Sequence, residues 1–203
     1  MIETLFWLID SLVVIALWLL AGWLAFLLIT RTINLHPVLM WLTRRLRIRY
    51  ININGQPYLE RYWLGTYFGR TFYLHRFVSC DSERCLHDHP WNARAFVISG
   101  WYKEQRLKYL CSKRGIISNI HTRKAGFFNR LSTTTFHRII TARENTWTLF
   151  WHGKREKEWG FIEQNYFNTS NDMLLVTYQQ TLDLTASIGW HKTAPLACES
   201  RLA

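Results

Sequence analysis

The stretch "CLHDHPWNARAFVISGWYKEQ", residues 85–105, decides how the rest of the chain is interpreted. It begins with two histidines, His87 and His89, on either side of one aspartate. Side chains two positions apart on a strand share a face, so both imidazoles would point inward, about 6–7 Å apart, and Asp88 outward. Two imidazoles placed in this way can bind one metal ion through bonds of about 2.0–2.1 Å. A polar turn that ends at Pro90 is the alternative explanation of the same residues.

A third histidine strengthens the metal hypothesis. His137 lies in "TTTFHRIITA", residues 133–142, where β-branched residues indicate a later strand. A strand that brings His137 against His87 and His89 would complete a face of three neutral nitrogen ligands. Such a set leaves positions open for water, dioxygen or a substrate. Because Fe, Zn, Mn, Ni and Cu all accept imidazole ligands, the sequence predicts one divalent metal but does not identify it.

The central part of the chain has the composition of a β domain. Seven runs are rich in β-branched and aromatic residues and are separated by Gly, Asn, Ser or Lys-Arg: 58–68, 71–79, 94–110, 115–131, 133–142, 146–154 and 157–164. Regular short strands without helical periodicity between them predict an all-β sandwich or barrel, which we place at residues 50–168.

The residues after this domain, 169–203, form a predicted C-terminal tail. The segment "MLLVTYQQTLDL", residues 173–184, fits either a further strand or a short helix. The last segment, "TAPLACESRLA", has no apolar periodicity, and we expect a loose end there.

Two segments of the chain resemble the two motifs of the cupin superfamily. They are "CLHDHPWNARAFVISGWYKEQ" and "KAGFFNRLSTTTFHRI", and the matching residues are His87, His89, Gly100, Gly126 and His137. More narrowly, "YLHRF", "LHDHPW", "SGWYKE", "FHRI" and "TLFWHGKREKEWGF", in this order, resemble a group of small bacterial and phage cupins. The likeness spans roughly residues 70–165. It implies a jelly-roll (double-stranded β-helix) barrel that binds one metal through His87, His89 and His137.

The resemblance has one important departure. The glutamate of the first cupin motif would fall at Ala93 or Arg94, and neither is a carboxylate. A site of three histidines without glutamate is similar to that of the thiol dioxygenases of the same superfamily. Counting from His89, strand parity predicts that Ala93, Ala95 and Val97 point inward and Arg94 outward, provided that no bulge follows the proline.

The remaining candidate residues are weaker. We expect His75 and Arg76 at the mouth of the barrel, and His152 near a turn rather than on a metal. His36 is expected beside the membrane, and His191 lies in the tail without a partner close in sequence. Tyr73 and Tyr102 would either pack in the core or place an acidic hydroxyl beside a metal. Four charged residues are expected in ion pairs near the rim: Glu104, Arg138, Arg155 and Glu158.

The N-terminal part, residues 1–30, is predicted to be a transmembrane helix. Residues 11–29 carry no charged side chain, and about 20 apolar residues are enough to cross a bilayer as a helix. A cleaved signal peptide is the alternative, but it would begin with positive charge, whereas Glu3 and Asp10 are the only charged residues before the apolar run. Asp10 fits the outer interface better than a functional position inside the membrane.

A basic segment, residues 31–49, follows the apolar run and contains five arginines: Arg31, Arg44, Arg45, Arg47 and Arg49. The positive-inside rule then predicts a single-pass protein with its N-terminus outside and its C-terminal domain in the cytoplasm. Residues 34–50 fit a short helix in the headgroup layer. Lipid therefore accounts for much of the net charge of +11, and nucleic acid is an unlikely partner.

Two classes of function remain open from the sequence. The first is a membrane-anchored metal protein with a small-molecule oxygenase-like activity, in which the metal acts as a Lewis acid or activates dioxygen. The second is a non-catalytic accessory subunit of a larger membrane complex, which the missing glutamate would permit. The substrate, the reaction and the oligomeric state do not follow from the residues.

Overall fold

The computed structural model describes residues 2–53, 55–79, 85–111, 114–166, 174–181 and 189–200. These residues belong to two units. Residues 1–35 form one unit and residues 36–203 the other.

The first unit consists of one helix, α1 (Ile2–Thr32), so the predicted apolar helix is present. Within it, Ser11–Thr30 is long and apolar enough to cross a membrane, and none of this segment is buried in the protein. Large side chains such as Trp18 and Leu19 are exposed along it. A signal sequence has the same length and composition, so membrane crossing itself stays a prediction.

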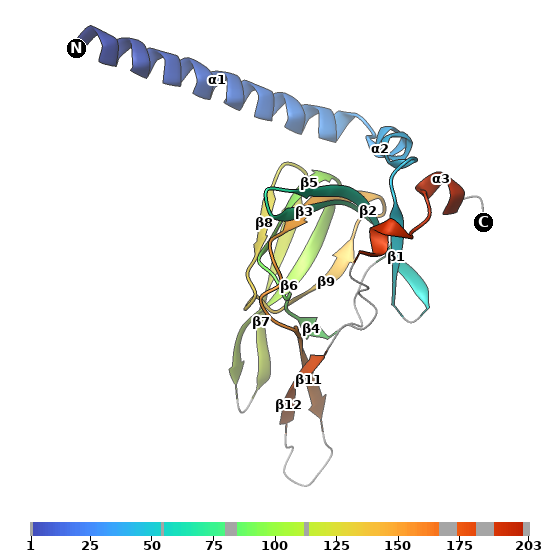
Figure 1. Cartoon of the computed structure of the whole chain (residues 1–203). Coiled ribbons are helices and arrows are strands. Elements are labelled where there is room, and N and C mark those ends of the chain that lie inside the picture. The colour runs from blue at the N-terminus through green and yellow to red at the C-terminus, as the bar shows by residue number, and fades with distance from the viewer. Residues whose placement is uncertain are drawn as a thin grey trace. The chain divides into compact units, whose positions relative to one another are not determined.

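The second unit is built on two antiparallel sheets of six strands each, as Figure 1 shows. The first sheet has the order β1-β2-β3-β10-β5-β8, and the second has the order β12-β11-β4-β9-β6-β7. The strands are β1 (Ile48–Ile53), β2 (Gln56–Tyr67), β3 (Arg70–Phe77), β4 (Leu86–His87), β5 (Ala93–Ser99), β6 (Trp101–Cys111), β7 (Gly115–Lys124), β8 (Phe128–Leu131), β9 (His137–Ala142), β10 (Thr146–His152), β11 (Trp159–Tyr166) and β12 (Leu174–Thr181).

The strand order identifies the fold. Strands β3, β10, β5 and β8 face β4, β9, β6 and β7, so the chain passes from one sheet to the other at almost every connection. Eight antiparallel strands connected in this way form a jelly roll, the architecture to which cupins belong. The predicted all-β jelly roll is therefore confirmed. The hairpins β6–β7 and β11–β12 extend beyond the barrel at the same end in Figure 1.

Strand β5 confirms the predicted parity. Ala93, Ala95 and Val97 are buried, whereas Arg94 is exposed. The alternation is regular because β5 pairs residue by residue with β10 through this stretch, where Ala95 lies opposite Phe150. The chain after Pro90 therefore contains no bulge that would turn Arg94 inward.

Gly100 makes the turn from β5 to β6 and so sets the position of the next strand. Its φ of 81° lies in the left-handed region, which glycine adopts at little cost. A Cβ at this position would lie 2.9 Å from Thr146 Cα, so a side chain would also collide with strand β10.

The C-terminal segment differs from the expected loose end. Of the two structures expected for residues 173–184, a strand or a helix, the strand is present as β12. Residues 189–200 then form a short 3-10 helix (Trp190–Lys192) and the helix α3 (Ala197–Ser200). Ile48 and Ala197 donate backbone hydrogen bonds to Pro195 and Leu46, at 3.1 and 3.0 Å. These contacts are made by the backbone, and for this reason no side-chain pattern predicted them.

The segment that precedes β1 contains a short helix, α2 (His36–Thr43), in agreement with the expected helix. Leu39 and Thr43 are buried. His36 also has a partner, because Trp147 Nε1 donates a hydrogen bond to its Nδ1 at 3.2 Å. Helix α2 therefore packs on the β domain at this histidine.

Candidate metal site

The structure brings the three predicted metal ligands together from two strands. His87 ends β4 and pairs directly with His137, the first residue of β9, while His89 follows β4 by two positions. The donor atoms of the three imidazoles all lie within 4.8 Å of one another. His87 and His137 are each only 5% exposed, so the group lies inside the barrel.

The donor set suits a divalent metal. Two nitrogens bound to one ion through bonds of about 2.0–2.1 Å are at most about 4.2 Å apart, close to the observed spread. His89 Nε2 and His137 Nε2 lie 2.8 Å from each other. Three imidazoles without a carboxylate ligand are typical of iron, zinc, copper and nickel sites. The fold thus brings together three imidazole donors, as a metal site requires. Metal binding itself stays a prediction.

The site contains a buried carboxylate that the sequence did not place there. Glu104 is fully buried, and its Oε1 lies 2.7 Å from Nδ1 of His137. It does form an ion pair, with Arg106 at 3.1 Å, but the expected position near the rim is wrong. Strand parity offered a signal, because Tyr102 and Glu104 alternate along β6 and both are buried.

The charge of Glu104 follows from its surroundings. Burial by itself raises the pKa of this carboxyl. The hydrogen bond and charge of His137, together with Arg106, outweigh burial and lower the pKa to about 2. Glu104 is therefore an anion at neutral pH. The neighbouring Tyr102 has a raised pKa, chiefly through burial and then through the charge of Glu104, and so it stays protonated.

Asp88, between the two histidines, has a structural role. It points away from the histidine group as expected, but it is fully buried rather than directed to solvent. Its Oδ1 accepts a hydrogen bond from Gly160 N at 2.8 Å, and its other oxygen forms an ion pair with Lys157. The predicted run 157–164 forms β11, which pairs with β4 in the same sheet. Strand parity does not record which strand becomes the neighbour, and this explains the wrong expectation. Asp88 therefore attaches β11 to β4.

Aromatic rings surround the histidine group. The ring of Trp159 lies 4.9 Å from that of His89 and 5.8 Å from that of His87, and Phe150 lies 6.4 Å from His89. The indole nitrogens of Trp91 and Trp159 are buried and meet no acceptor among the residues that the structure describes. Both can donate a hydrogen bond to a bound small molecule.

His75 and His152 lie outside the three-histidine group. His75 is buried and accepts a hydrogen bond from Arg61 Nε at 3.1 Å, so the expected place at the barrel mouth is wrong. His152 stacks on Trp91, with ring centroids 4.2 Å apart. Burial is the main cause that lowers the pKa of both imidazoles, and the charge of Arg61 adds to it.

The other candidates take structural positions. Arg76 forms an ion pair with Glu60 at 2.9 Å, and Arg155 forms the expected exposed pair with Glu158. Arg138 donates a hydrogen bond to Gln105 at 2.6 Å. Tyr73 is buried in a core cluster with Phe150, so it packs rather than presenting an acidic hydroxyl. Burial raises its pKa.

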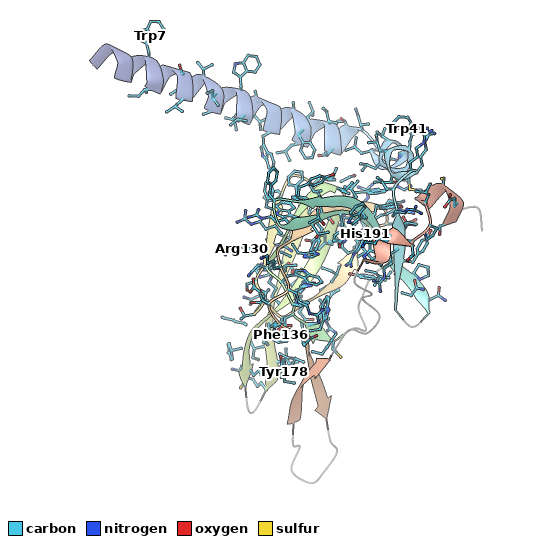
Figure 2. All side chains as sticks on the ribbon, viewed as in Figure 1. Trp7, Trp41, Arg130, Phe136, Tyr178 and His191 are labelled. Atoms are coloured by element: carbon cyan, nitrogen blue, oxygen red, sulfur yellow. The ribbon has the colours of Figure 1, made fainter. Side chains whose placement is uncertain are left out.

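His191 gains a partner from the fold. Its ring stacks on Trp63, with centroids 4.1 Å apart. The C-terminal segment thus contacts the β domain through side chains as well as backbone. Figure 2 labels His191 in this segment.

Fold and site together define a jelly-roll protein with a buried three-histidine group suited to a divalent metal. No family model and no curated protein matches the chain. Parts of several solved structures are similar to this chain in fold. An Fe(II)-HppE bound to the alternative substrate (S)-1-HPP is 11% identical, with 55% of this chain and 57% of that chain covered, at a TM-score of 0.43.

Two further structures show a comparable likeness. Streptomyces albus HEPD, with 2-hydroxyethylphosphonate and Fe(II) bound, is 12% identical over 55% of this chain and 25% of its own, at a TM-score of 0.43. A mannose-6-phosphate isomerase candidate from Ralstonia eutropha is 16% identical over 49% of this chain and 88% of its own, at a TM-score of 0.40. The match spans little more than half of the HppE chain and a quarter of the HEPD chain.

Proposed function

We propose that the chain is a metal-dependent protein in which His87, His89 and His137 bind one divalent ion. The observation that carries this proposal is the convergence of three imidazoles, whose donor atoms lie within 4.8 Å of one another inside the barrel. A divalent ion with open positions would supply Lewis acidity or a place for dioxygen to react, and we propose a small-molecule oxygenase-like activity.

The residues around the group support a small-molecule site. Trp91, Trp159 and Phe150 provide apolar walls, and the two indole N–H groups provide donors. A ligand with an acceptor group and an apolar body fits these surroundings better than a strongly charged one. Apolar walls with a few polar contacts are typical of small-molecule sites.

Metal analysis of anaerobically purified protein, followed by an oxygen-uptake assay, tests this function. We expect about one divalent ion per chain in the wild type, and loss of that ion in His87→Ala. The matched control is His152→Ala, which removes a neighbouring histidine outside the group. Equal metal content in the wild type and in His87→Ala would rule out the proposed site.

A separate experiment tests the alternative that the protein is an accessory subunit of a membrane complex. Gentle solubilisation followed by native electrophoresis shows whether the protein migrates alone or in a stable complex. Co-migration with other membrane proteins, in the absence of metal, would favour the subunit over the enzyme.

We further propose that the chain is anchored in a membrane by α1, with its C-terminal domain in the cytoplasm. Helix α2 supports this proposal. Val38, Trp41 and Leu42 are exposed at helical spacing, whereas Leu39 is buried. The guanidinium of Arg44 lies 5.1 Å from the Trp41 ring centre. An apolar face beside basic residues is typical of helices in the headgroup layer.

The outer face of the first sheet also supports a location at an anionic surface. Strands β3, β5, β8 and β10 contain no acidic residue. Their outward side chains include Phe72 and Trp151, which are stacked at 6.1 Å, and the exposed Arg94, which pairs across the sheet with Arg130. An exposed sheet face is ordinarily polar, so aromatic and basic residues together indicate contact with a neighbour.

A further inference from the structure

We propose that Glu104 is a positioning residue that holds His137 in the tautomer required for metal binding. This inference rests on the proposed metal site, and it concerns a residue outside the set of three ligands. The observation behind it is a buried carboxylate in contact with the ring nitrogen of His137 that faces away from the other histidines.

The two ring nitrogens of His137 have different neighbours. Nδ1 lies 2.7 Å from Glu104 Oε1, and Nε2 lies 2.8 Å from His89 Nε2. An ionised carboxylate can only accept a hydrogen bond, so a hydrogen bond across this 2.7 Å contact places the hydrogen of the ring on Nδ1. Metal binding requires the neutral ring, in which the lone pair then lies on Nε2, directed towards His89. Metal-binding histidines commonly donate their other ring N–H to a carboxylate, which fixes the orientation of the ring.

The second oxygen of Glu104 is surrounded by donors. Oε2 accepts a hydrogen bond from Asn129 Nδ2 at 3.0 Å and lies 3.1 Å from Arg106 and 3.5 Å from Arg123. The amide of Asn129 cannot be reversed, because its Oδ1 accepts a hydrogen bond from Arg106 Nη2 at 2.5 Å. Arg106 Nη2 is also within 3.2 Å of Oε1, so it holds both oxygens. The carboxylate plane is therefore fixed from the side opposite His137.

These contacts predict an unusual effect of Glu104→Gln, which keeps the size of the side chain. Arg106 Nη2 approaches both oxygens and so opposes an NH2 group in either orientation. The amide oxygen takes the place of Oε2, because the reverse orientation would also set the NH2 group against the donors of Asn129 and Arg123. The NH2 group then faces His137 Nδ1, which becomes an acceptor. The hydrogen of the ring moves to Nε2, and the lone pair needed by the metal is lost. An amide beside a functional histidine selects the wrong tautomer in this way.

The tautomer can be measured directly by 15N NMR of the histidine side chains in the metal-free full-length chain, solubilised in detergent. At a pH at which the His137 ring is neutral, we expect its hydrogen on Nδ1 in the wild type and on Nε2 in Glu104→Gln. Glu104→Asp retains an acceptor and is expected to keep the wild-type tautomer. Hydrogen on Nε2 in the wild type would overturn the proposal, and this result needs no variant to fold.

Zinc titration of the same proteins gives the second readout. We expect Glu104→Gln to lower the zinc affinity by about 10- to 100-fold, the usual effect of removing a carboxylate behind a metal-binding histidine. Glu104→Asp should lie between the wild type and Glu104→Gln. Unchanged zinc affinity and tautomer in folded Glu104→Gln would contradict the role of Glu104 while leaving the metal site intact.

Glu60→Gln is the matched control. Glu60 is 5% exposed, forms a comparable ion pair with Arg76 at 2.9 Å and accepts a hydrogen bond from Tyr62, but it lies on the other sheet. Its substitution should lower stability without changing either the His137 tautomer or zinc affinity. A wild type with the expected tautomer that binds no metal would refute the proposed function and leave the effect of Glu104 on His137 standing.

Discussion

At the scale of single residues, the three histidines differ from the other histidines of the β domain in what surrounds them. His87, His89 and His137 face one another, whereas His75 and His152 each contact aromatic rings and the backbone or an arginine. The spacing of residues in the sequence separates only His87 and His89 from the other histidines. The pairing of His87 with His137 across two strands completes the group.

Asp88 leads to the first prediction at this scale. Asp88→Ala removes the partner of the half-buried Lys157 and leaves the Gly160 N–H without its acceptor. We expect the free energy of unfolding to fall by about 2–3 kcal/mol, measured by denaturant titration. Glu158→Ala breaks the exposed pair with Arg155 and should cost less than about 1 kcal/mol. Similar losses in both variants would contradict a structural role for Asp88.

The second residue-scale prediction concerns pH. The pKa of His75 is well below 6.5 in the folded protein because burial and Arg61 disfavour the charged ring. The unfolded chain therefore takes up the proton first as the pH falls. Stability is complete above about pH 6.5 and decreases below it, by up to about 1.4 kcal/mol per pH unit for one such group.

Thermal unfolding between pH 7.5 and 5 measures this dependence. Since the other histidines also titrate, the informative quantity is the difference between the wild type and His75→Gln. The variant should lose less stability on acidification than the wild type. Parallel pH profiles would show that His75 is not the group responsible.

At the scale of elements, the C-terminal segment stabilises the start of the β domain. Residues 189–200 form hydrogen bonds with residues 44–48, and Ala197 is fully buried. Arg47 Nη1 also donates a hydrogen bond to Ala194 O at 2.6 Å. A segment without apolar periodicity thus forms part of the fold, because its contacts are mostly between backbone groups.

Removal of residues 189–203 tests this contribution. The truncation removes several backbone hydrogen bonds and the ring that stacks on Trp63, so we expect a loss of about 2–4 kcal/mol and a lower midpoint of thermal unfolding. Deletion of residues 201–203 alone serves as the control and should leave the midpoint unchanged. Equal midpoints for both truncations would refute the assigned role.

At the scale of the whole molecule, the membrane proposal makes a direct prediction. The full-length chain should stay with the membrane fraction after alkaline carbonate extraction, because a span of about 20 apolar residues inserts stably. A chain that begins at residue 36 should be released. Intact mass analysis of the extracted protein must still find α1, since loss of this helix would identify it as a cleaved signal sequence.

The sequence by itself determined the β architecture, the parity of β5 and the identity of the three histidines. These follow from local rules: the alternation of side chains along a strand, turn residues at defined places and apolar runs of fixed length. The resemblance to cupin motifs added the jelly-roll class, which local rules do not contain.

Only the tertiary structure decided what surrounds the histidines. Glu104 reaches His137 because β6 pairs with β9, and Asp88 is bound by the backbone of β11 because β11 pairs with β4. The tail contacts β1 through backbone groups that every residue carries. Contacts between segments far apart in the chain depend on strand pairing and burial, and these are properties of the folded molecule that no local pattern records.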